Sequence, residues 1–90
     1  MPNVSFTGKI VYDDGSEIAG TTGEYVTYAS FMETKSWRGH CVAPAGEVVA
    51  PGDCRLVLND GREARIVIDS LSSGPNQTTI AFFKGSGPWP

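Results

Sequence analysis

Long apolar runs are missing from this chain, and residues that build metal or disulfide sites are few. No apolar run approaches the roughly 18 residues that a membrane-spanning helix needs, so we expect no membrane partner. Two cysteines and one histidine exclude a disulfide-rich scaffold and leave few metal ligands. Lys and Arg number seven against ten Asp and Glu, and this net charge of −3 disfavours a nucleic-acid partner.

Residues that break helices are abundant by comparison. Eleven Gly and six Pro are too many for a helical bundle and are typical of short strands joined by turns. The 90 residues suffice for one domain, which we expect to span residues 1–90 and to end in a Gly/Pro-rich tail at residues 85–90. Residues 1–5 show no features of a secretory signal, so the sequence predicts a cytoplasmic protein.

A quasi-repeat relates residues 9–18 to residues 55–64 at an offset of 46. In both segments an Asp-Gly pair separates two apolar stretches, which is the strongest short-range signal of a β-hairpin. The sequence therefore predicts two similar hairpins, one at residues 4–20 and one at residues 53–69.

The side-chain alternation predicts the register of the second hairpin. A two-residue loop would place Arg65 opposite Leu56 and so mix charge into an apolar face. A three-residue loop at residues 59–61 instead gathers the apolar side chains on one face: Cys54, Leu56, Leu58, Ala64, Ile66 and Ile68. Such a loop is a type I turn followed by a G1 bulge, with Gly61 in the left-handed conformation.

The first hairpin follows the same rule with a loop at residues 13–15. This register sets Ile10 opposite Ile18 inside and Val11 opposite Glu17 outside. The charged residues of both hairpins then share the outer faces, where opposite charges on neighbouring strands contribute roughly 0.2–1 kcal/mol a pair. These residues are Lys9, Glu17, Arg55, Glu63 and Arg65.

Two further segments have strand character. Residues 24–32 are rich in β-branched and aromatic residues, although residues 32–36 could instead form a short helical turn. Residues 77–84 are expected to form the last strand, which is apolar on both faces near its end.

Gly and Pro predict where the remaining strands are interrupted. Residues 20–23 and 72–75 carry turn signals. Val42 and residues 47–49 are bounded by prolines, which suits edge strands or loops. The whole pattern predicts an all-β fold, a small barrel or sandwich of six or seven short antiparallel strands.

The two cysteines raise the question of a metal site. His40, Cys41, Asp53 and Cys54 could supply four ligands, but adjacent side chains on a strand point to opposite faces and no Cys-x-x-Cys spacing occurs. We therefore expect no metal and no cofactor, with both cysteines buried and reduced. A disulfide is the alternative if the protein is exported.

Catalytic patterns are equally sparse. The single histidine, His40, has no nucleophile and acid placed as a triad needs, and the glycines at residues 85–87 precede no helix that could hold a phosphate. The sequence therefore predicts that the protein is not an enzyme, and a small enzyme is the least favoured alternative.

The segment at residues 33–40 follows neither a strand nor a helix period, yet it holds a Trp and an Arg. A segment that local rules do not explain is where function is expected. The candidate partner-binding residues are Lys35, Trp37, Arg38, His40 and, from the tail, Trp89. The alternative for Trp37 is that its indole caps the core.

These observations favour a non-enzymatic module for protein–protein interaction or assembly, in the role of an accessory protein, inhibitor or structural subunit. Its partner would be another protein or a second copy of itself, because Trp and Arg dominate interface energetics. The alternative is a barrel that binds single-stranded nucleic acid, since aromatic and basic residues interleave at residues 35–40.

Overall fold

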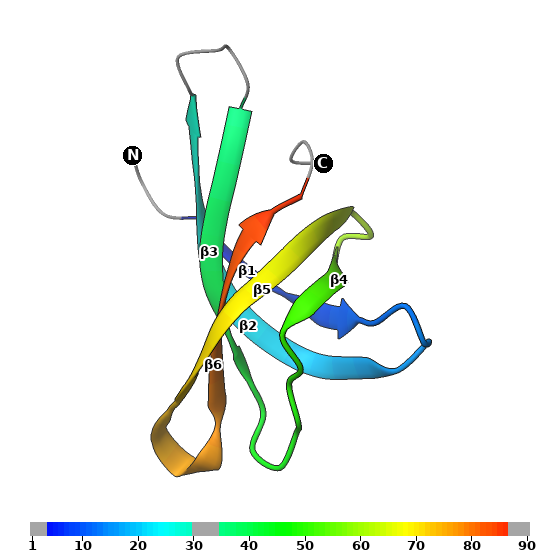
Figure 1. Ribbon diagram of the computed structural model, residues 1–90, viewed down its shortest axis with the longest axis vertical. Coiled ribbons are helices and arrows are strands. Elements are labelled where there is room, and N and C mark those ends of the chain that lie inside the picture. Colours follow the sequence, from blue (N-terminus) through cyan, green and yellow to red (C-terminus); the bar gives the residue numbers. More distant parts are fainter. Residues whose placement is uncertain (1–3, 30–34, 87–90) are drawn as a thin grey trace.

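Six antiparallel strands close into a small barrel in the computed structural model, which describes residues 4–29 and 35–86 (Figure 1). The order around the barrel is β1-β2-β3-β6-β5-β4. The predicted all-β barrel is thus confirmed. The strands are β1 (Val4–Val11), β2 (Glu17–Ala29), β3 (Lys35–Ala43), β4 (Gly52–Leu58), β5 (Glu63–Ser73) and β6 (Thr79–Gly85), with a 3₁₀ turn (Pro75–Gln77) between the last two.

The register predicted for the second hairpin is confirmed. Leu56 lies opposite Ala64. At the loop, the Leu58 N–H donates to the Arg62 carbonyl at 2.8 Å and the Gly61 N–H donates to the Leu58 carbonyl at 2.9 Å. Gly61 has φ +95°, the left-handed conformation that the G1 bulge requires.

The first hairpin has the same geometry, as predicted. Ile10 lies opposite Ile18, and the Tyr12 N–H donates to the Ser16 carbonyl at 2.9 Å. Gly15 has φ +93° at the position that corresponds to Gly61. Two loops of the same type therefore close the two halves of the quasi-repeat.

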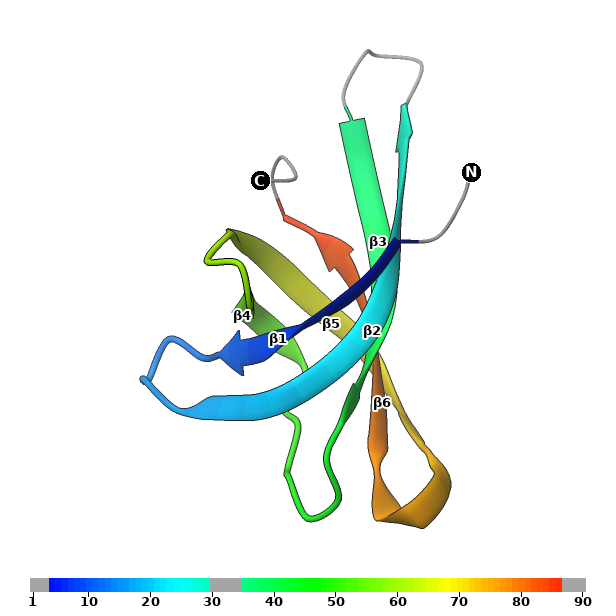
Figure 2. The same ribbon diagram turned by 180° about the vertical axis from the view of Figure 1, so that it is seen from behind.

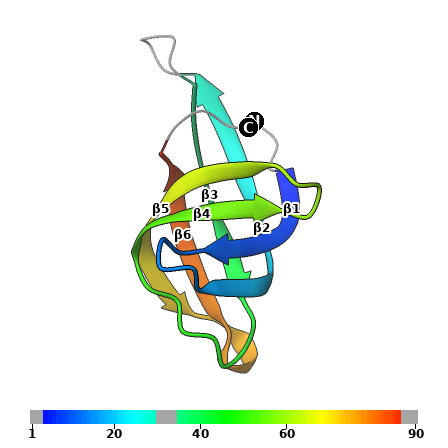
Figure 3. The same ribbon diagram turned by 90° about the vertical axis from the view of Figure 1, so that its right-hand side faces the viewer.

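The barrel consists of two topologically equivalent halves. Each half is an antiparallel meander of three strands, and closure pairs β1 with β4 and β3 with β6. Figure 3 shows β4 lying between β1 and β5. Ile10 and Leu56, which hold the same place in the quasi-repeat, lie directly opposite each other. If β1, β2 and β3 are exchanged with β4, β5 and β6, the order of strands around the barrel stays the same. This is the relation that an approximate two-fold axis produces.

The core is filled by the inward side chains of all six strands, and one end of it is aromatic. Trp37 packs edge-on against Phe83 with ring centroids 5.8 Å apart and against Tyr25 at 6.3 Å. Phe6 completes this cluster at 6.2 Å from Tyr25. Gly85 makes the fit possible, because a β-carbon there would overlap the indole of Trp37.

The turn predicted at residues 20–23 is wrong. These residues belong to β2, which is long and curved, pairing first with β1 and then with β3 (Figure 2). Between Ile18 and Thr21 the strand holds one residue more than β1, and Gly20 has φ +70°. The glycine signal therefore marks a β-bulge, where Thr21 is buried and its hydroxyl donates to the Ile18 carbonyl at 3.1 Å.

Two other expectations about β3 need correction. Val42 lies inside β3, between β2 and β6, and not in an edge strand or loop. Pro44 follows the last residue of β3, so it interrupts no ladder there. Residues 35 and 36 belong to β3 and not to a helical turn, while residues 32–34 lie outside the described residues.

The connection between the halves is attached to the barrel through the Tyr12 hydroxyl and the side chain of Val49. The Tyr12 hydroxyl accepts the Ala50 N–H at 3.0 Å and donates to the Ala50 carbonyl at 3.2 Å. Val49 is buried beside this contact, whereas Val48 is 87% exposed. Residues 47–49 are indeed a loop, and one residue of it belongs to the core.

The G1 bulge at Gly61 gives the first prediction. Gly61→Val should lower the free energy of unfolding by about 1 kcal/mol or more, because a β-branched residue resists positive φ. Gly61→Asn is the matched control and should lose less, since Asn tolerates the left-handed region. Urea denaturation of the three proteins measures the difference, and equal losses for Val and Asn would contradict the left-handed assignment.

The contact between Trp37 and Gly85 gives the second prediction. Gly85→Ala should lose about 1–3 kcal/mol of stability, as overpacking does in a core. In a Trp37→Leu background the same change should cost much less, because the indole atoms Nε1 and Cε2 that would overlap the new methyl group are gone. A double-mutant cycle by urea denaturation measures this coupling, and additive losses would show that the indole does not limit residue 85.

Candidate functional site

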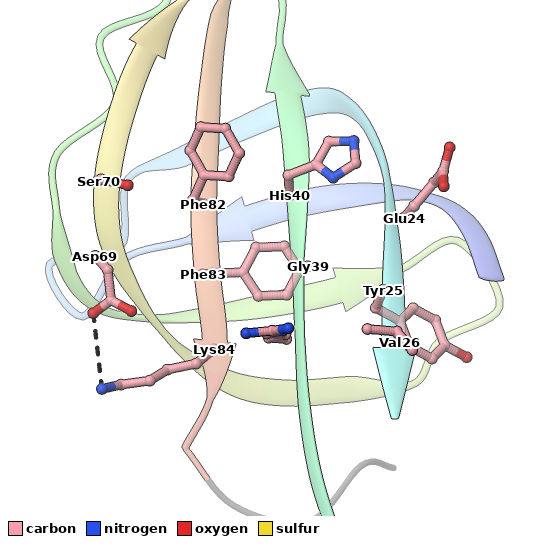
Figure 4. Close-up of a pocket in the computed structure, with 11 residues that line it drawn as sticks. Glu24, Tyr25, Val26, Gly39, His40, Asp69, Ser70, Phe82, Phe83 and Lys84 are labelled. Carbon is pink, nitrogen blue, oxygen red and sulfur yellow. Dashed lines mark ion pairs between the residues drawn. The ribbon is translucent and has the colours of Figure 1, made fainter. Parts of the chain in front are cut away.

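One row of side chains crosses the outer face of four neighbouring strands. Glu24 of β2 lies opposite His40 of β3, which lies opposite Phe82 of β6, which lies opposite Ser70 of β5. The residues on either side of this row in each strand include Tyr25, Cys41 and Phe83, which point into the core. The row therefore faces outwards, as Figure 4 shows for its labelled side chains.

An open concavity of about 540 Å³ lies over this face (Figure 4). Phe82 lines one edge of it with 43% of its surface exposed, and its ring centroid lies 6.2 Å from that of His40. An exposed Phe next to an imidazole is an apolar surface that a ligand or partner can cover. The concavity is lined by Glu24, Tyr25, Val26, Arg38, Gly39, His40, Asp69, Ser70, Phe82, Phe83 and Lys84.

A second row places two cations side by side. Arg38 of β3 lies directly opposite Lys84 of β6, and both side chains are exposed. Like charges at directly opposite positions repel each other. The Asp69 carboxylate lies 4.0 Å from the Lys84 ammonium and offsets part of this repulsion (Figure 4). Asp69 sits at a bulge in β5, where the strand has one residue more than β6.

A third row is aliphatic at its centre. Val42 of β3 lies opposite Ile80 of β6, and both are half-buried. The paired strands β3 and β6 thus carry a stripe that changes from basic to aromatic to aliphatic along its length. We call the outward residues of the three rows the β3–β6 face: Thr22, Glu24, Val26, Arg38, His40, Val42, Val67, Asp69, Ser70, Ser72, Ile80, Phe82 and Lys84.

The opposite side of the barrel is different in kind. Its outer surface on β1, β2, β4 and β5 carries ion pairs, both within each hairpin and between the two hairpins. Lys9 pairs with Glu17 at 2.9 Å and Arg55 with Glu63 at 3.1 Å, confirming the predicted outer placement of these charges. The β3–β6 face differs in exposing the aromatic ring of Phe82 beside its charges.

The predicted binding residues separate into three groups. Arg38 and His40 lie on the β3–β6 face and line its concavity. The expectation that Trp37 lies on the surface needs correction, because its side chain is 2% exposed and fills the core. The side chain of Lys35 and all of Trp89 lie outside the described residues.

The correction for Trp37 has a simple physical cause. Residues 35–43 form a strand, so alternate residues point to opposite sides, and the indole and guanidinium of neighbouring residues cannot share a surface. Burial of the indole agrees with the core alternative, and its removal would cost about 3–5 kcal/mol.

The residues of the face that were not singled out from the sequence include Phe82, Lys84 and Glu24. The signal for Phe82 was present, because the end of the last predicted strand is apolar on both faces. One of two consecutive phenylalanines on a strand must point away from the core. The sequence does not say which of the two does so.

The two cysteines are buried in the core as free thiols. Burial raises the pKa of the Cys41 thiol to about 12 and that of the Cys54 thiol to about 11. Among residues 4–29 and 35–86, no three His, Cys, Asp or Glu side chains are grouped closely enough to hold a metal ion. In the same residues no helix is long and apolar enough to cross a membrane.

The buried thiols give a prediction about pH. Both pKa values lie above the ordinary value of 9.0, so the unfolded chain loses these protons at a lower pH than the folded protein does. Their contribution to stability is therefore complete below about pH 9 and is lost as the pH rises towards 11 to 12. Urea denaturation between pH 7 and 11 should show this decline.

The control is the Cys41→Ala, Cys54→Ala variant, which should be less stable at pH 7 but lose less stability on going to pH 11. Native thiols should also react slowly with iodoacetamide at pH 8, and both should react after denaturation without reductant. Parallel pH dependence in the two proteins, or a missing adduct after denaturation, would contradict the assignment of two buried, protonated thiols.

Comparison of the chain with protein-family models, with curated proteins and with solved structures finds no match. The function is therefore inferred from the geometry of the β3–β6 face alone.

Proposed function

We propose that the protein is a non-enzymatic interaction module whose partner docks on the β3–β6 face. The observation that carries the proposal is the exposed ring of Phe82, 43% accessible at the edge of an open concavity. Aromatic and Arg side chains at the centre of a contact contribute most of its binding energy. Phe82, His40 and Arg38 are thus the anchors, and the hydroxyl and carboxylate groups of β2 and β5 form a polar rim.

The geometry favours binding over catalysis. The hydroxyl in the row, that of Ser70, is separated from His40 by the whole of β6. Strands lie about 4.8 Å apart, so the two backbones are about 10 Å apart, too far for a hydrogen bond between these outward side chains. Phe82 lies between them.

The charges of the face favour a protein partner over a nucleic acid. The cations Arg38 and Lys84 on the two middle strands are flanked by the carboxylates Glu24 on β2 and Asp69 on β5. A polyanion that reached the cations would lie against these carboxylates as well. A protein surface can carry both signs of charge at matching positions.

The two free, buried thiols support a reducing compartment, so we place this module in the cytoplasm.

A photo-crosslinking experiment tests the proposal. Benzoylphenylalanine is introduced at position 82 in one protein and at position 48 in another, because Val48 is 87% exposed but lies in the loop between the halves. Irradiation with the partner present should give a specific adduct from position 82 and none from position 48. Phe82→Asp should weaken partner capture by tenfold or more while melting near the wild-type temperature, since the side chain is not part of the core.

Two outcomes would overturn the proposal. One is capture that is unchanged in a folded Phe82→Asp variant. The other is crosslinking from position 48 with none from position 82, which would move the contact to the loop.

A further inference from the structure

Resting on the proposed function, we infer that the partner binds through an extended segment, which adds as a new strand to the free edge of β5 at residues 69–73. Unpaired backbone groups at this edge supply the main-chain hydrogen bonds of such a contact. The exposed ring of Phe82 beside the edge selects a side chain of the added strand.

The edge is free because β4 and β5 separate at Ile68. Gly52, the first residue of β4, lies opposite Ile68, and the preceding Pro51 has no N–H to pair with β5. A bulge between Ile68 and Ser70 bends β5 at the same point. β5 then continues beside β6, and the ends of these two strands extend beyond β4 (Figures 1 and 2). No described residue pairs with residues 69–73 on the β4 side.

The alternation of hydrogen bonds identifies the backbone groups that point to this edge. The Gly74 N–H donates to the Thr78 carbonyl on the β6 side at 2.9 Å. The register from there back to Ser70 is unbroken, and alternate residues of an antiparallel strand bond to the same neighbour. Gly74 and every second residue before it thus bond to β6. The N–H and C=O groups of Leu71 and Ser73 therefore point away from β6, where an added strand can bond to them.

The side chains at this edge do not discourage pairing. Natural sheets protect their edge strands with Lys, Pro or inward-pointing charges. Residues 70–73 carry neither charge nor proline, and all are exposed. Leu71 lies opposite the buried Ala81 and so faces the core side of the sheet, yet 40% of it is exposed. A strand beside β5 would cover the Leu71 side chain.

The outer side of the edge lies close to Phe82. Ser70 separates the edge from Phe82, because these two residues lie opposite each other on β5 and β6. An added strand would lie about 4.8 Å beyond β5, so its residue beside Ser70 would be about 10 Å from Phe82. The side chain of Ser70 is small, so a long or aromatic side chain can lie across it and contact the Phe82 ring. The partner segment is therefore expected to carry such a side chain on its outer face.

The same geometry disfavours a second copy of this chain as the added strand. If residues 69–73 of two copies paired antiparallel around Leu71, Ser70 of each copy would lie beside Ser72 of the other. A serine side chain is too short to reach across another serine, so Phe82 would stay exposed. The partner is thus a different chain, with an apolar residue beside Leu71 and a long or aromatic residue beside Ser70.

Amide hydrogen exchange measured by NMR tests the free edge. In the protein alone, the amides of Leu71 and Ser73 should exchange at least tenfold faster than that of Ser72, which is bonded to β6. The probe is a nine-residue peptide with a lysine at each end and alternating valine and threonine between them, with phenylalanine replacing the central threonine. At about 1 mM this peptide should slow exchange at Leu71 and Ser73 tenfold or more.

The matched control is the same peptide with its valine nitrogens methylated. In the predicted pairing the valines lie on the side of Leu71 and their N–H groups point to β5, so methylation should abolish the protection. A second peptide that keeps the central threonine should bind the wild-type protein several-fold more weakly than the phenylalanine peptide. In Phe82→Ala this difference between the two peptides should disappear.

Two variants of the chain test the contact from the other side. Ser73→Pro removes an N–H that points to the free edge, and Leu71→Lys places a charge beside it. Each should weaken binding of the labelled phenylalanine peptide tenfold or more in fluorescence anisotropy while melting near the wild-type temperature. Val48→Lys adds the same charge on the exposed loop and should bind like the wild type.

Three results would overturn the inference. Slow exchange at Leu71 and Ser73 in the dilute protein alone would show that the edge is already covered. A peptide that gives no protection, or whose methylated form protects equally well, would exclude strand addition. Protection that develops only as the protein alone is concentrated, with a dimer in sedimentation equilibrium, would assign the edge to a second copy.

Failure of this inference is distinguishable from failure of the proposed function. If position 82 crosslinks to a partner whose capture is unchanged in Leu71→Lys and Ser73→Pro, the interaction module stands and strand addition is wrong. Capture that is unchanged in Phe82→Asp overturns the proposed function itself.

Discussion

The position of the Trp37 indole inside the barrel is the constraint on which the rest of the structure depends. It contacts Phe83 and Tyr25 on the two neighbouring strands and lies against the bare backbone of Gly85. Because side chains alternate along a strand, this inward position sends Arg38 outward, and the inward ring of Phe83 sends its neighbours outward as well. The same alternation of side chains along β3 and β6 thus determines both which residues fill the core and which residues form the exposed face.

The hairpins could be predicted from the sequence because local rules determine them. An Asp-Gly loop allows few registers, and a wrong register would have placed charged residues such as Arg65 among apolar ones. The paired strands confirmed both registers. Two strands that follow each other in the sequence and are joined by a short turn also pair with each other in the fold, so a local sequence pattern is enough to predict their pairing.

The strand at residues 35–43 was harder to predict for a reason that its structure makes plain. Its inward positions include Gly39, which has no side chain to reveal an apolar period, and its outward positions include Val42. The glycine at position 20 was misread because positive φ serves a bulge as well as a turn. Closure of β3 on β6 joins residues about 40 apart in the sequence, so no local pattern could show that His40 and Phe82 share a surface.

The two sides of the barrel have equivalent topology but different chemistry. On the side where β1 meets β4, the charges form ion pairs within each hairpin and between the two hairpins. On the side where β3 meets β6, Arg38 and Lys84 lie opposite each other and an aromatic ring is exposed. A symmetrical scaffold thus carries one surface suited to solvent and one suited to contact.

The loop that joins the two meanders has a consequence for how the chain holds together. The halves are linked covalently only through residues 44–51, while the seams between β1 and β4 and between β3 and β6 hold them to each other. Cleavage of the peptide bond beside the exposed Val48 would leave two fragments of three strands, each with unpaired edges and half of a core. Reassociation of the two fragments would pair these strand edges again and complete the core. The barrel is therefore equivalent to a dimer of two covalently linked halves and is suited to fragment complementation.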